Sequence, residues 1–325
     1  MGCLGSDMSN TAVVICTRGR PRIVAALVGL LAKQSKPPDH IFVIATRAED
    51  IAGLNRNQRH LTVAIGRTGL TLQRNDGLAL AGSRFSTIVF FDDDFVPSRF
   101  WLERVARIFE SEPDIAGVTG IVLADGTTNA GIPLHEAEAF VQLHDFGEAT
   151  SDILHDHIAF GSNMGCNMAF RYSALRDLKF DERLPLYAWL EDHDFRGQVE
   201  PHGRVVRSDA LWGVHLGHKP GRLRGVMLGY SQVANAAYLA SKGTVPKPYL
   251  AKLVCKNLLI NAARSFWPEP FVDRRGRLLG NMKALFDLVR GRMAPERILE
   301  LDVNRNVQPV RSAPLLPTGS IDTSR

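Results

Sequence analysis

The sequence predicts an α/β fold in which a mixed, mostly parallel sheet of Rossmann-like type is flanked by helices and followed by a helical C-terminal extension. Over residues 11–125, short apolar runs rich in β-branched residues alternate with segments of helical periodicity, which is typical of strand–helix–strand units. The 325 residues are 45% hydrophobic and 22% charged, an ordinary globular composition that excludes a collagen-like or wholly disordered chain. No internal repeat is visible, which argues against a solenoid.

The predicted elements follow one another along the first half of the chain. The run Ala12-Val13-Val14-Ile15-Cys16 is apolar and β-branched, which predicts a strand buried on both faces. Pro21 can open the next helix, because proline is favoured at the first helical position. The predicted strands are 12–16, 41–45, 61–65, 87–91 and 115–123, and the predicted helices are 21–34, 72–81 and 101–109. In such a sheet a ligand is expected at the carboxyl ends of the strands.

Positive charge is concentrated in the last quarter of the chain. The formal net charge is +5, yet residues from Tyr249 onward contain 13 Lys and Arg against 7 Asp and Glu, and the remainder contains 26 against 27. This distribution argues against a body that binds nucleic acid. An apolar helical stripe in this quarter consists of Leu278, Leu279, Met282, Leu285, Phe286 and Val289, and the arginines near its ends are Arg274, Arg275, Arg277, Arg290 and Arg292.

Two interpretations of this basic helix stay open. It can lie on anionic lipid or bind a diphosphate headgroup, since both attract a basic amphipathic helix. It can instead pack on the catalytic domain with a solvated basic rim, and this second interpretation is favoured, because a core contact needs the same apolar stripe.

The domain organisation follows from these composition changes. The longest apolar run, residues 25–32, has 8 residues, whereas about 20 are needed to cross a bilayer. The N-terminus lacks a secretory signal, and the four cysteines form no Cys-x-x-Cys pair, so we expect no disulfide framework. A cytoplasmic protein is expected, with peripheral contact at the inner face of the cell membrane as an option. The expected segments are a flexible leader (1–10), a main α/β domain (11–243, with a first half over 11–125 and a second half over 126–243), a basic helical extension (244–303) and a flexible tail (304–325).

An acidic triplet follows the clearest predicted strand. Asp92, Asp93 and Asp94 come directly after Phe91, and three neighbouring carboxylates need a counter-cation to be ordered at a strand end. Mg²⁺ or Mn²⁺ prefers oxygen ligands and often shares carboxylates with substrate phosphates. The alternative is an acidic solvated turn that opens a helix at Ser98, where negative charge suits the helix dipole. The position of the triplet after a buried strand favours the metal site.

A second acidic group lies in the segment Trp189-Leu190-Glu191-Asp192-His193-Asp194-Phe195. Its aromatic and aliphatic neighbours predict partial burial, which raises the pKa of a carboxyl and suits it to general-base work. The alternative is a helix N-terminus capped by acids. The two acidic groups together fit one reaction, in which one holds a metal on the leaving group and the other removes a proton from a nucleophile.

The combination of motifs resembles the family-two glycosyltransferases of GT-A fold over about residues 11–240. That family has a first strand ending in a Thr/Arg-rich loop, an Arg-Asn ahead of an Asp-x-Asp strand, a Gly-x-Asn-x-x-Phe segment and a Glu-Asp pair. The corresponding segments here are Cys16-Thr17-Arg18-Gly19-Arg20-Pro21, Gln73-Arg74-Asn75-Asp76-Gly77, Phe90-Phe91-Asp92-Asp93-Asp94, Gly165-Cys166-Asn167-Met168-Ala169-Phe170 and Leu190-Glu191-Asp192.

The resemblance implies that residues 11–243 form a GT-A catalytic domain, with a nucleotide-sugar half over 11–125 and an acceptor half over 126–243. It also implies roles for individual residues. The implied donor-binding residues are Thr17, Arg18 and Arg20 at the nucleotide, Arg74 and Asn75 near the ribose and diphosphate, and Asp92 and Asp93 in the triplet. The implied metal ligands are Asp94 and Asp92, joined by His215, since similar proteins place a histidine there. Asp192 is the implied base, Glu191 positions it or the acceptor, and Gly165, Asn167 and Trp189 are the expected acceptor-binding residues. The family's Asp after the second strand, which reads the uracil edge, is absent, and Glu49 or Asp50 is a candidate substitute.

Four further histidines carry no comparable signal. His135, His144, His155 and His157 lie in a polar stretch without helical ligand spacing, and residues 127–161 are expected to form a loop over the site that selects the sugar and the acceptor.

Three function classes follow from the motifs. The leading hypothesis is an inverting, metal-dependent glycosyltransferase that moves a sugar from a UDP-sugar to a hydroxyl of a glycan or a polyprenyl-diphosphate-linked acceptor. A sugar-phosphate nucleotidyltransferase is the first alternative, although the chain lacks the Gly-rich, Lys-containing phosphate loop expected for it. The second is a non-catalytic carbohydrate-binding protein, which has no need for two intact acidic groups.

Overall fold

The computed structural model describes residues 10–147, 154–155, 165–218 and 223–302. The predicted leader up to residue 9 and the predicted tail from residue 304 lie outside the described residues. The centre is a nine-stranded mixed sheet with the order β3-β2-β1-β4-β8-β6-β9-β5, and β7 pairs with β9. The strands are β1 (Thr11–Thr17), β2 (His40–Ala45), β3 (Leu61–Ile65), β4 (Thr87–Asp92), β5 (Phe95–Pro97), β6 (Ile115–Asp125), β7 (Leu154–His155), β8 (Asn167–Arg171) and β9 (Arg204–His215).

Half of the sheet is parallel, as the strand–helix alternation predicts. Strand β1 pairs in parallel with β2 and with β4, and β2 pairs in parallel with β3. Strand β1 is buried on both faces, with Val13 and Ile15 in one apolar cluster and Ala12 and Val14 in the other. This two-sided burial explains why its sequence is a continuous apolar run rather than an alternating one.

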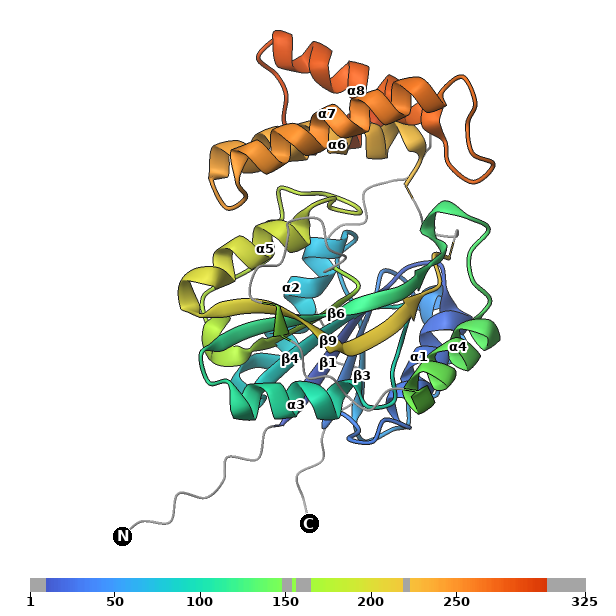
Figure 1. Cartoon of the computed structure of the whole chain (residues 1–325), viewed down its shortest axis with the longest axis vertical. Helices are drawn as coiled ribbons and strands as arrows, with labels where there is room; N and C mark the ends of the chain where they lie inside the picture. Colours follow the sequence, from blue (N-terminus) through green and yellow to red (C-terminus); the bar gives the residue numbers. More distant parts are fainter. Residues whose placement is uncertain (1–9, 148–153, 156–164, 219–222, 303–325) are drawn as a thin grey trace.

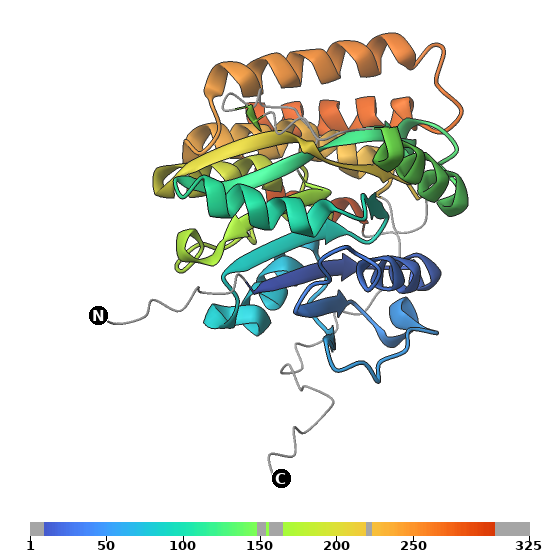
Figure 2. The same ribbon diagram turned by 60° about the horizontal axis from the view of Figure 1, so that its bottom comes forward.

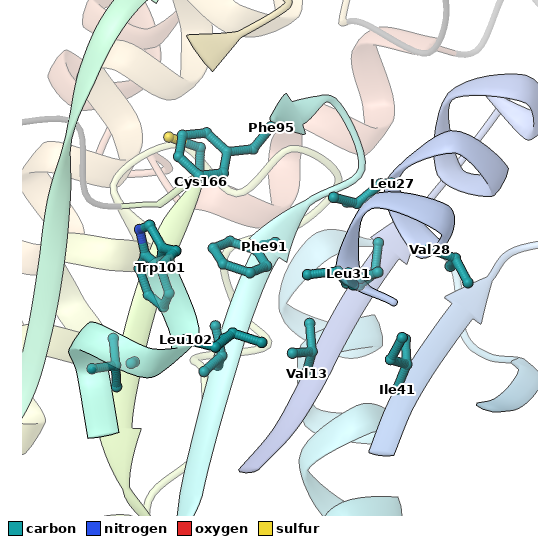
Figure 3. Packing of buried hydrophobic residues seen from close by; sticks show 14 of the residues in the cluster. Val13, Leu27, Val28, Leu31, Ile41, Phe91, Phe95, Trp101, Leu102 and Cys166 are labelled. Carbon is teal, nitrogen blue, oxygen red and sulfur yellow. The ribbon is translucent and has the colours of Figure 1, made fainter. Parts of the chain in front are cut away.

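Helices cover both faces of this half. Helices α1 (Pro21–Leu31) and α3 (Trp101–Ser111) pack on one face, where Trp101 and Phe91 stand edge to face with ring centroids 4.7 Å apart (Figure 3). Helices α2 (Leu70–Ala81) and α5 (Glu191–Val199) cover the other face. The strands and helices predicted for the first half are therefore present, with ends that differ by a few residues.

The other half of the sheet is mixed. Strand β8 runs antiparallel between β4 and β6, and β9 runs parallel to β6 and antiparallel to β5. Because β5 pairs with β9 through Phe95 and His215, the end of β9 comes to lie beside the acidic triplet that precedes β5. The site thus depends on pairings between segments about 120 residues apart in the sequence.

One alternative interpretation and one expectation about connecting segments are wrong. The triplet does not open a helix at Ser98, because Phe95–Pro97 first form strand β5 and helix α3 begins only at Trp101. The expected loop over 127–161 contains helix α4 (Leu134–Gly147), which buries Ala137 and Val141 against β5 and β9. His135 and His144 lie on α4, His155 lies in β7, and His157 lies outside the described residues.

Three long helices follow the sheet: α6 (Gly225–Lys242), α7 (Lys247–Arg264) and α8 (Arg274–Val289), with a final 3₁₀ segment at Pro295–Asp302. They lie beyond α5 and α2, whereas α3 lies on the opposite side of the sheet (Figure 1). Helices α6 and α8 cross closely at Gly229 and Gly280, since a Cβ on either glycine lies 2.0 Å from a carbonyl oxygen of the other helix. Among the described helices, none has both the length and the apolar character that a membrane span requires.

The described cysteines, Cys16, Cys166 and Cys255, are free, which agrees with the expectation from their spacing. Cys3 lies outside the described residues.

Candidate active site

The acidic triplet lies at the carboxyl end of β4, in the middle of the sheet. Asp92 ends the strand, and its register partner Cys16 lies just before the end of β1. Asp93 and Asp94 form the turn to β5 and are 4% and 2% exposed. Buried carboxylates need partners, and the loops after β1 and β9 supply them.

Arg20 and Thr17, from the loop after β1 and from its end, hold the second aspartate of the triplet. The Thr17 hydroxyl donates to Asp93 over 2.7 Å, and Arg20 Nη1 lies 2.6 Å from Asp93 and 3.1 Å from Asp94. Burial raises the pKa of Asp93 to about 6 against the opposing charge of Arg20. These predicted donor-binding residues therefore form one network around the triplet.

Asp92, Asp94 and His215 form a candidate metal centre. One ligand atom of each lies within 4.8 Å of the others. His215 Nε2 is 3.2 Å from Asp94 Oδ1, and the backbone N–H of His218 donates to Asp94 Oδ2 over 2.8 Å. These are the three residues for which the sequence predicts metal ligation, and the pairing of β5 with β9 brings them together.

A fourth carboxylate contacts the ring nitrogen of His215 that does not face Asp94. Asp125, at the end of β6, lies 3.1 Å from His215 Nδ1, so the ring is held between two acids. Burial lowers the pKa of an imidazolium, but Asp125 and Asp94 outweigh burial and raise the pKa of His215 to about 10. Burial also acts to raise the pKa of Asp94, yet His215 and Arg20 hold it below its usual range. Such an outer carboxylate orients a ligating imidazole in many metal sites.

The second acidic group opens helix α5 after an unusual turn. Leu186, Ala188 and Leu190 all have positive φ angles, of 60°, 53° and 74°, which cost a non-glycine residue roughly 1 kcal/mol or more each. The turn places Glu191 and Asp192 at the first two positions of α5. The interpretation of these acids as the start of a helix is therefore confirmed, and the role of a general base stays a prediction.

Arg74 connects the two acidic groups. Its guanidinium is 2% exposed and lies 3.1 Å from Asp92 and 2.5 Å from Glu191. The same guanidinium donates to the carbonyl of Gly165 over 2.7 Å and lies over the ring of Phe180 at 5.2 Å. The triplet and the Glu-Asp pair, which are about 100 residues apart in the sequence, are therefore neighbours across one arginine.

The two adjacent acids of α5 have opposite pKa shifts. Burial raises the pKa of Glu191 to about 8 in spite of Arg74, and among the described residues its buried Oε2 atom has no hydrogen-bond partner. Burial also acts to raise the pKa of Asp192, but His193 and Arg74 outweigh it and hold the value at about 2. The expectation that burial raises the pKa is thus correct for Glu191 and wrong for Asp192, whose hydrogen bonds stabilise the carboxylate.

Two side chains without a predicted role lie behind Asp192: His193 holds its carboxylate, and Tyr249 contacts His193. His193 donates its backbone N–H to Asp192 over 2.9 Å, and its ring Nδ1 lies 2.8 Å from the same oxygen. The hydroxyl of Tyr249, on α7, lies 3.2 Å from His193 Nε2. Asp125 was also missed, although its place after a predicted strand could have indicated it; Tyr249 left no local signal, because its contact is set by the packing of α7.

Other predicted site residues make contacts inside the protein. Asn75 binds both the N–H and the C=O of Phe180 at 2.9 Å. Asn167 is fully buried, and its Oδ1 accepts from Gly120 N–H over 2.6 Å. Asp50 accepts from the N–H of Gly19 over 2.8 Å and so braces the loop after β1.

The remaining candidates differ in how far they reach solvent. Arg18 and Glu49 are exposed. Trp189 is half-buried, and its carbonyl accepts from Asn235 on α6 over 2.8 Å. Gly165 donates its N–H to Asp192 over 3.0 Å, and a Cβ there lies 3.4 Å from both acids of α5. The backbone of Gly165 therefore lies directly against the carboxylates of Glu191 and Asp192.

Comparison with known proteins gives a consistent result. The family model described as "Glycosyl transferase family 2" matches residues 12–179, more than half of the chain. No curated protein sequence matches significantly. Among solved structures, TarS 1-349 from S. aureus has a TM-score of 0.51 at 15% identity, with 90% of this chain and 83% of that chain covered. The same TarS 1-349 in complex with UDP-GlcNAc also has a TM-score of 0.51, at 16% identity.

A further solved structure, that of GalNAc-T7 with UDP, GalNAc and Mn²⁺, has a TM-score of 0.50 at 10% identity. The match covers 92% of this chain and 57% of that chain. At these identities the likeness concerns the fold, and it confirms the fold class predicted from the sequence.

Proposed function

Because the chain belongs to glycosyl transferase family 2 and is a glycosyltransferase, we propose that it moves a sugar from a nucleoside diphosphate sugar to a hydroxyl group with inversion at the anomeric carbon. The observation that carries this proposal is the contact of Arg74 with both Asp92 and Glu191, which joins the two acidic groups in one site. A UDP-sugar is the proposed donor, since the neighbours TarS and GalNAc-T7 were solved with UDP-GlcNAc and with UDP. The proposed acceptor is a hydroxyl of a glycan or lipid-linked glycan.

A divalent cation fits the first acidic group. Asp92, Asp94 and His215 offer two carboxylates and one imidazole within 4.8 Å of one another, a donor set that suits Mg²⁺ or Mn²⁺. When bound, such a cation stabilises the negative charge that develops on the departing diphosphate. Asp94, held ionised by His215 and Arg20, is the proposed principal ligand.

Arg20 and the triplet then form the donor side of the site. Arg20 is anchored between Asp93 and Asp94 and also donates to the carbonyl of His218 over 3.0 Å. Its guanidinium is thereby fixed in a position next to the metal ligands, where positive charge favours a diphosphate. Fixed charges of this kind lower the barrier because they need no rearrangement as charge moves to the leaving group.

Asp192 is the proposed base. Its carboxylate is ionised at neutral pH and 16% exposed, whereas Glu191 is 6% exposed. The acceptor oxygen attacks the anomeric carbon from the face opposite the diphosphate, the bond from that carbon to the diphosphate oxygen breaks, and the hydroxyl proton passes to Asp192. His193 and Gly165 keep the carboxylate pointed at the acceptor through their hydrogen bonds. Glu191, with its raised pKa, is the proposed positioning residue.

A pair of isosteric substitutions tests this assignment. We expect Asp192→Asn to lower kcat by about 10²- to 10⁴-fold, the usual contribution of a general base, while Mn²⁺-dependent thermal stabilisation by UDP stays as in the wild type. Glu191→Gln keeps a neutral group beside Arg74 and is expected to retain activity within about tenfold. The exposed Asp177 supplies a matched control as Asp177→Asn. Full transfer activity in Asp192→Asn removes that residue from the mechanism.

A further inference from the structure

We propose that the outer face of α7 and α8 docks the protein on an anionic lipid bilayer. This face consists of Lys252, Lys256, Leu259, Phe266 and Trp267 of α7 and the following turn, and of Leu279, Met282, Lys283, Phe286 and Val289 of α8. Helix α7 is at the outer edge of the molecule in Figure 2. The proposal goes beyond glycosyl transfer and does not depend on it.

Large apolar side chains are exposed on this face. Phe266 and Trp267, at the end of α7, are 72% and 77% exposed, and Val289, at the end of α8, is 87% exposed. Leu279, Met282 and Phe286 follow at spacings of three and four residues, so they form one stripe of α8. Contiguous exposed apolar surface of this kind marks a site of contact with another molecule or a membrane.

The apolar parts of the two helices are continuous. A hollow of about 520 Å³ between them is lined by Ser265, Phe266, Arg275, Leu278, Leu279 and Met282. Phe266 at the end of α7 therefore lies beside the apolar stripe of α8. The two elements offer one surface rather than two separate patches.

The charges on this face are unbalanced in favour of cations. Helix α7 contains Lys247, Lys252, Lys256 and Arg264 and has no Asp or Glu. Within the described part of the chain, no ion pair involves Lys252, Lys256 or Lys283.

Most carboxylates nearby are in ion pairs, whereas Asp273, which lines a hollow with Leu279 and Lys283, accepts the backbone N–H of Gly276. Glu269 pairs with Arg274 at 2.9 Å, and Asp287 pairs with Arg292 at 3.1 Å and with Arg297 at 2.8 Å. The free charge on the outer face is thus positive, which complements a surface of anionic lipid headgroups.

The combination of residues selects a bilayer over a protein partner. Aromatic and aliphatic side chains bordered by lysines are typical of helices that lie in the plane of a membrane interface, where Trp and Lys reach the headgroup level. The core of a protein–protein interface, by contrast, is depleted of lysine. Core packing, the interpretation favoured from the sequence for the α8 stripe, holds for Leu285, which packs against buried residues of α6. Leu279, Met282 and Phe286 of the same stripe are exposed.

The geometry also relates this face to the active site. Helix α7 begins next to the proposed base Asp192, since Tyr249 lies beside His193. The exposed Phe266 and Trp267 follow the other end of the helix. Its 18 residues span about 27 Å at the usual rise of an α-helix. Because the proposed face runs along α7 from Lys252 to Leu259 and on to Trp267, a protein docked by it holds the start of α7, and the acceptor side beside it, close to the lipid surface.

Vesicle binding by the full chain tests the proposal. We expect co-sedimentation with vesicles of phosphatidylcholine and phosphatidylglycerol in equal parts, and little with phosphatidylcholine alone. Lys252→Ala/Lys256→Ala/Lys283→Ala should weaken this binding roughly a hundredfold, because each surface cation contributes about fivefold. High salt should weaken wild-type binding in the same direction, since it screens these charges.

Trp267 provides an internal probe of insertion. Trp101 and Trp212 are buried and Trp189 is half-buried, so Trp267 is the exposed tryptophan whose emission changes on entering lipid. We expect a blue shift with the anionic vesicles and none in Trp267→Phe. Phe266→Ser/Trp267→Ser should lose vesicle binding while keeping the wild-type melting temperature, because both side chains are exposed.

Matched controls separate this face from the rest of the surface. Phe140→Ser/Leu143→Ser removes exposed apolar side chains on α4, and Lys33→Ala/Arg56→Ala/Arg59→Ala removes three exposed cations elsewhere. Both should bind vesicles as the wild type does. Equal loss in the controls, equal binding to neutral vesicles, or a stable dimer in light scattering that Phe266→Ser/Trp267→Ser converts to a monomer would each overturn the proposal.

Discussion

Replacing Arg74 with methionine tests the contact on which the active-site argument depends. Arg74 is almost fully buried and is shared by Asp92, Glu191 and the carbonyl of Gly165. Removing one partner of a buried ion pair leaves an uncompensated charge and costs about 3–5 kcal/mol. Protonation of Glu191, whose pKa is already raised to about 8, relieves part of that cost. We therefore expect Arg74→Met to lower the free energy of unfolding by about 3 kcal/mol, the lower end of that range.

Urea unfolding, followed by tryptophan fluorescence, measures this loss. The matched control is Arg204→Met, because Arg204 also joins two carboxylates, at 2.5 Å from Asp114 and 3.0 Å from Glu112, but is 36% exposed. Exposed pairs contribute at most about 1 kcal/mol. The double variant Arg74→Met/Asp92→Asn should recover part of the loss, since it also removes the carboxylate that Arg74→Met leaves unpaired. Equal unfolding curves for Arg74→Met and Arg204→Met would refute the reasoning.

Three further outcomes follow from the structure. Asp94→Asn should weaken Mn²⁺-dependent UDP binding by at least about tenfold, or 1.4 kcal/mol, in calorimetric titrations, with no change when EDTA is present. Gly77→Ala should cost about 1–3 kcal/mol of stability, because its Cβ lies 2.4 Å from Val14 Cγ1, whereas Gly29→Ala, with open space around it, should add about 0.5–1 kcal/mol. The pKa of Asp192 is lowered in the folded protein, so its ionised carboxylate stabilises the fold above the unfolded pKa of 3.8. This stabilisation is lost as the pH falls toward about 2. The difference in unfolding free energy between wild type and Asp192→Asn should therefore shrink by up to about 2 kcal/mol over that pH interval.

The sequence predicts the parallel half of the fold well because its signals are local. An apolar run such as residues 12–16 can only be a strand buried on both faces, and Pro21 marks the start of α1 independently of the rest of the chain. Strands β5 and β8 have no such signal, because they are short and owe their extended form to antiparallel partners far away in the sequence. The strand order of the mixed half of the sheet therefore cannot be predicted from local sequence patterns and is known only from the structure.

The same distinction applies to the site. The resemblance to the family, rather than spacing alone, implies that His215 joins Asp92 and Asp94, and in the structure one ligand atom of each lies within 4.8 Å of the others. Spacing cannot tell a side chain that faces a ligand from one that ties two segments together. Asn75 and Asn167 match the family motif, yet in the structure their amides bind the backbone of Phe180 and of Gly120.

The donor side of the proposed site, which is the acidic triplet, and the acceptor side, which is helix α5, are held by different parts of the chain. The family match ends at residue 179 and so includes the acidic triplet and Arg74 but neither Asp192 nor His215. Helix α5, which carries Asp192, is held by residues from the end of α6 and beyond: Lys242 lies 2.7 Å from Asp194, and Thr244 donates to the same carboxylate over 2.5 Å. Because α5 depends on these C-terminal contacts while the triplet depends on β1 and β9, changes in α6 or α7 should alter the handling of the acceptor and leave the binding of the donor unchanged.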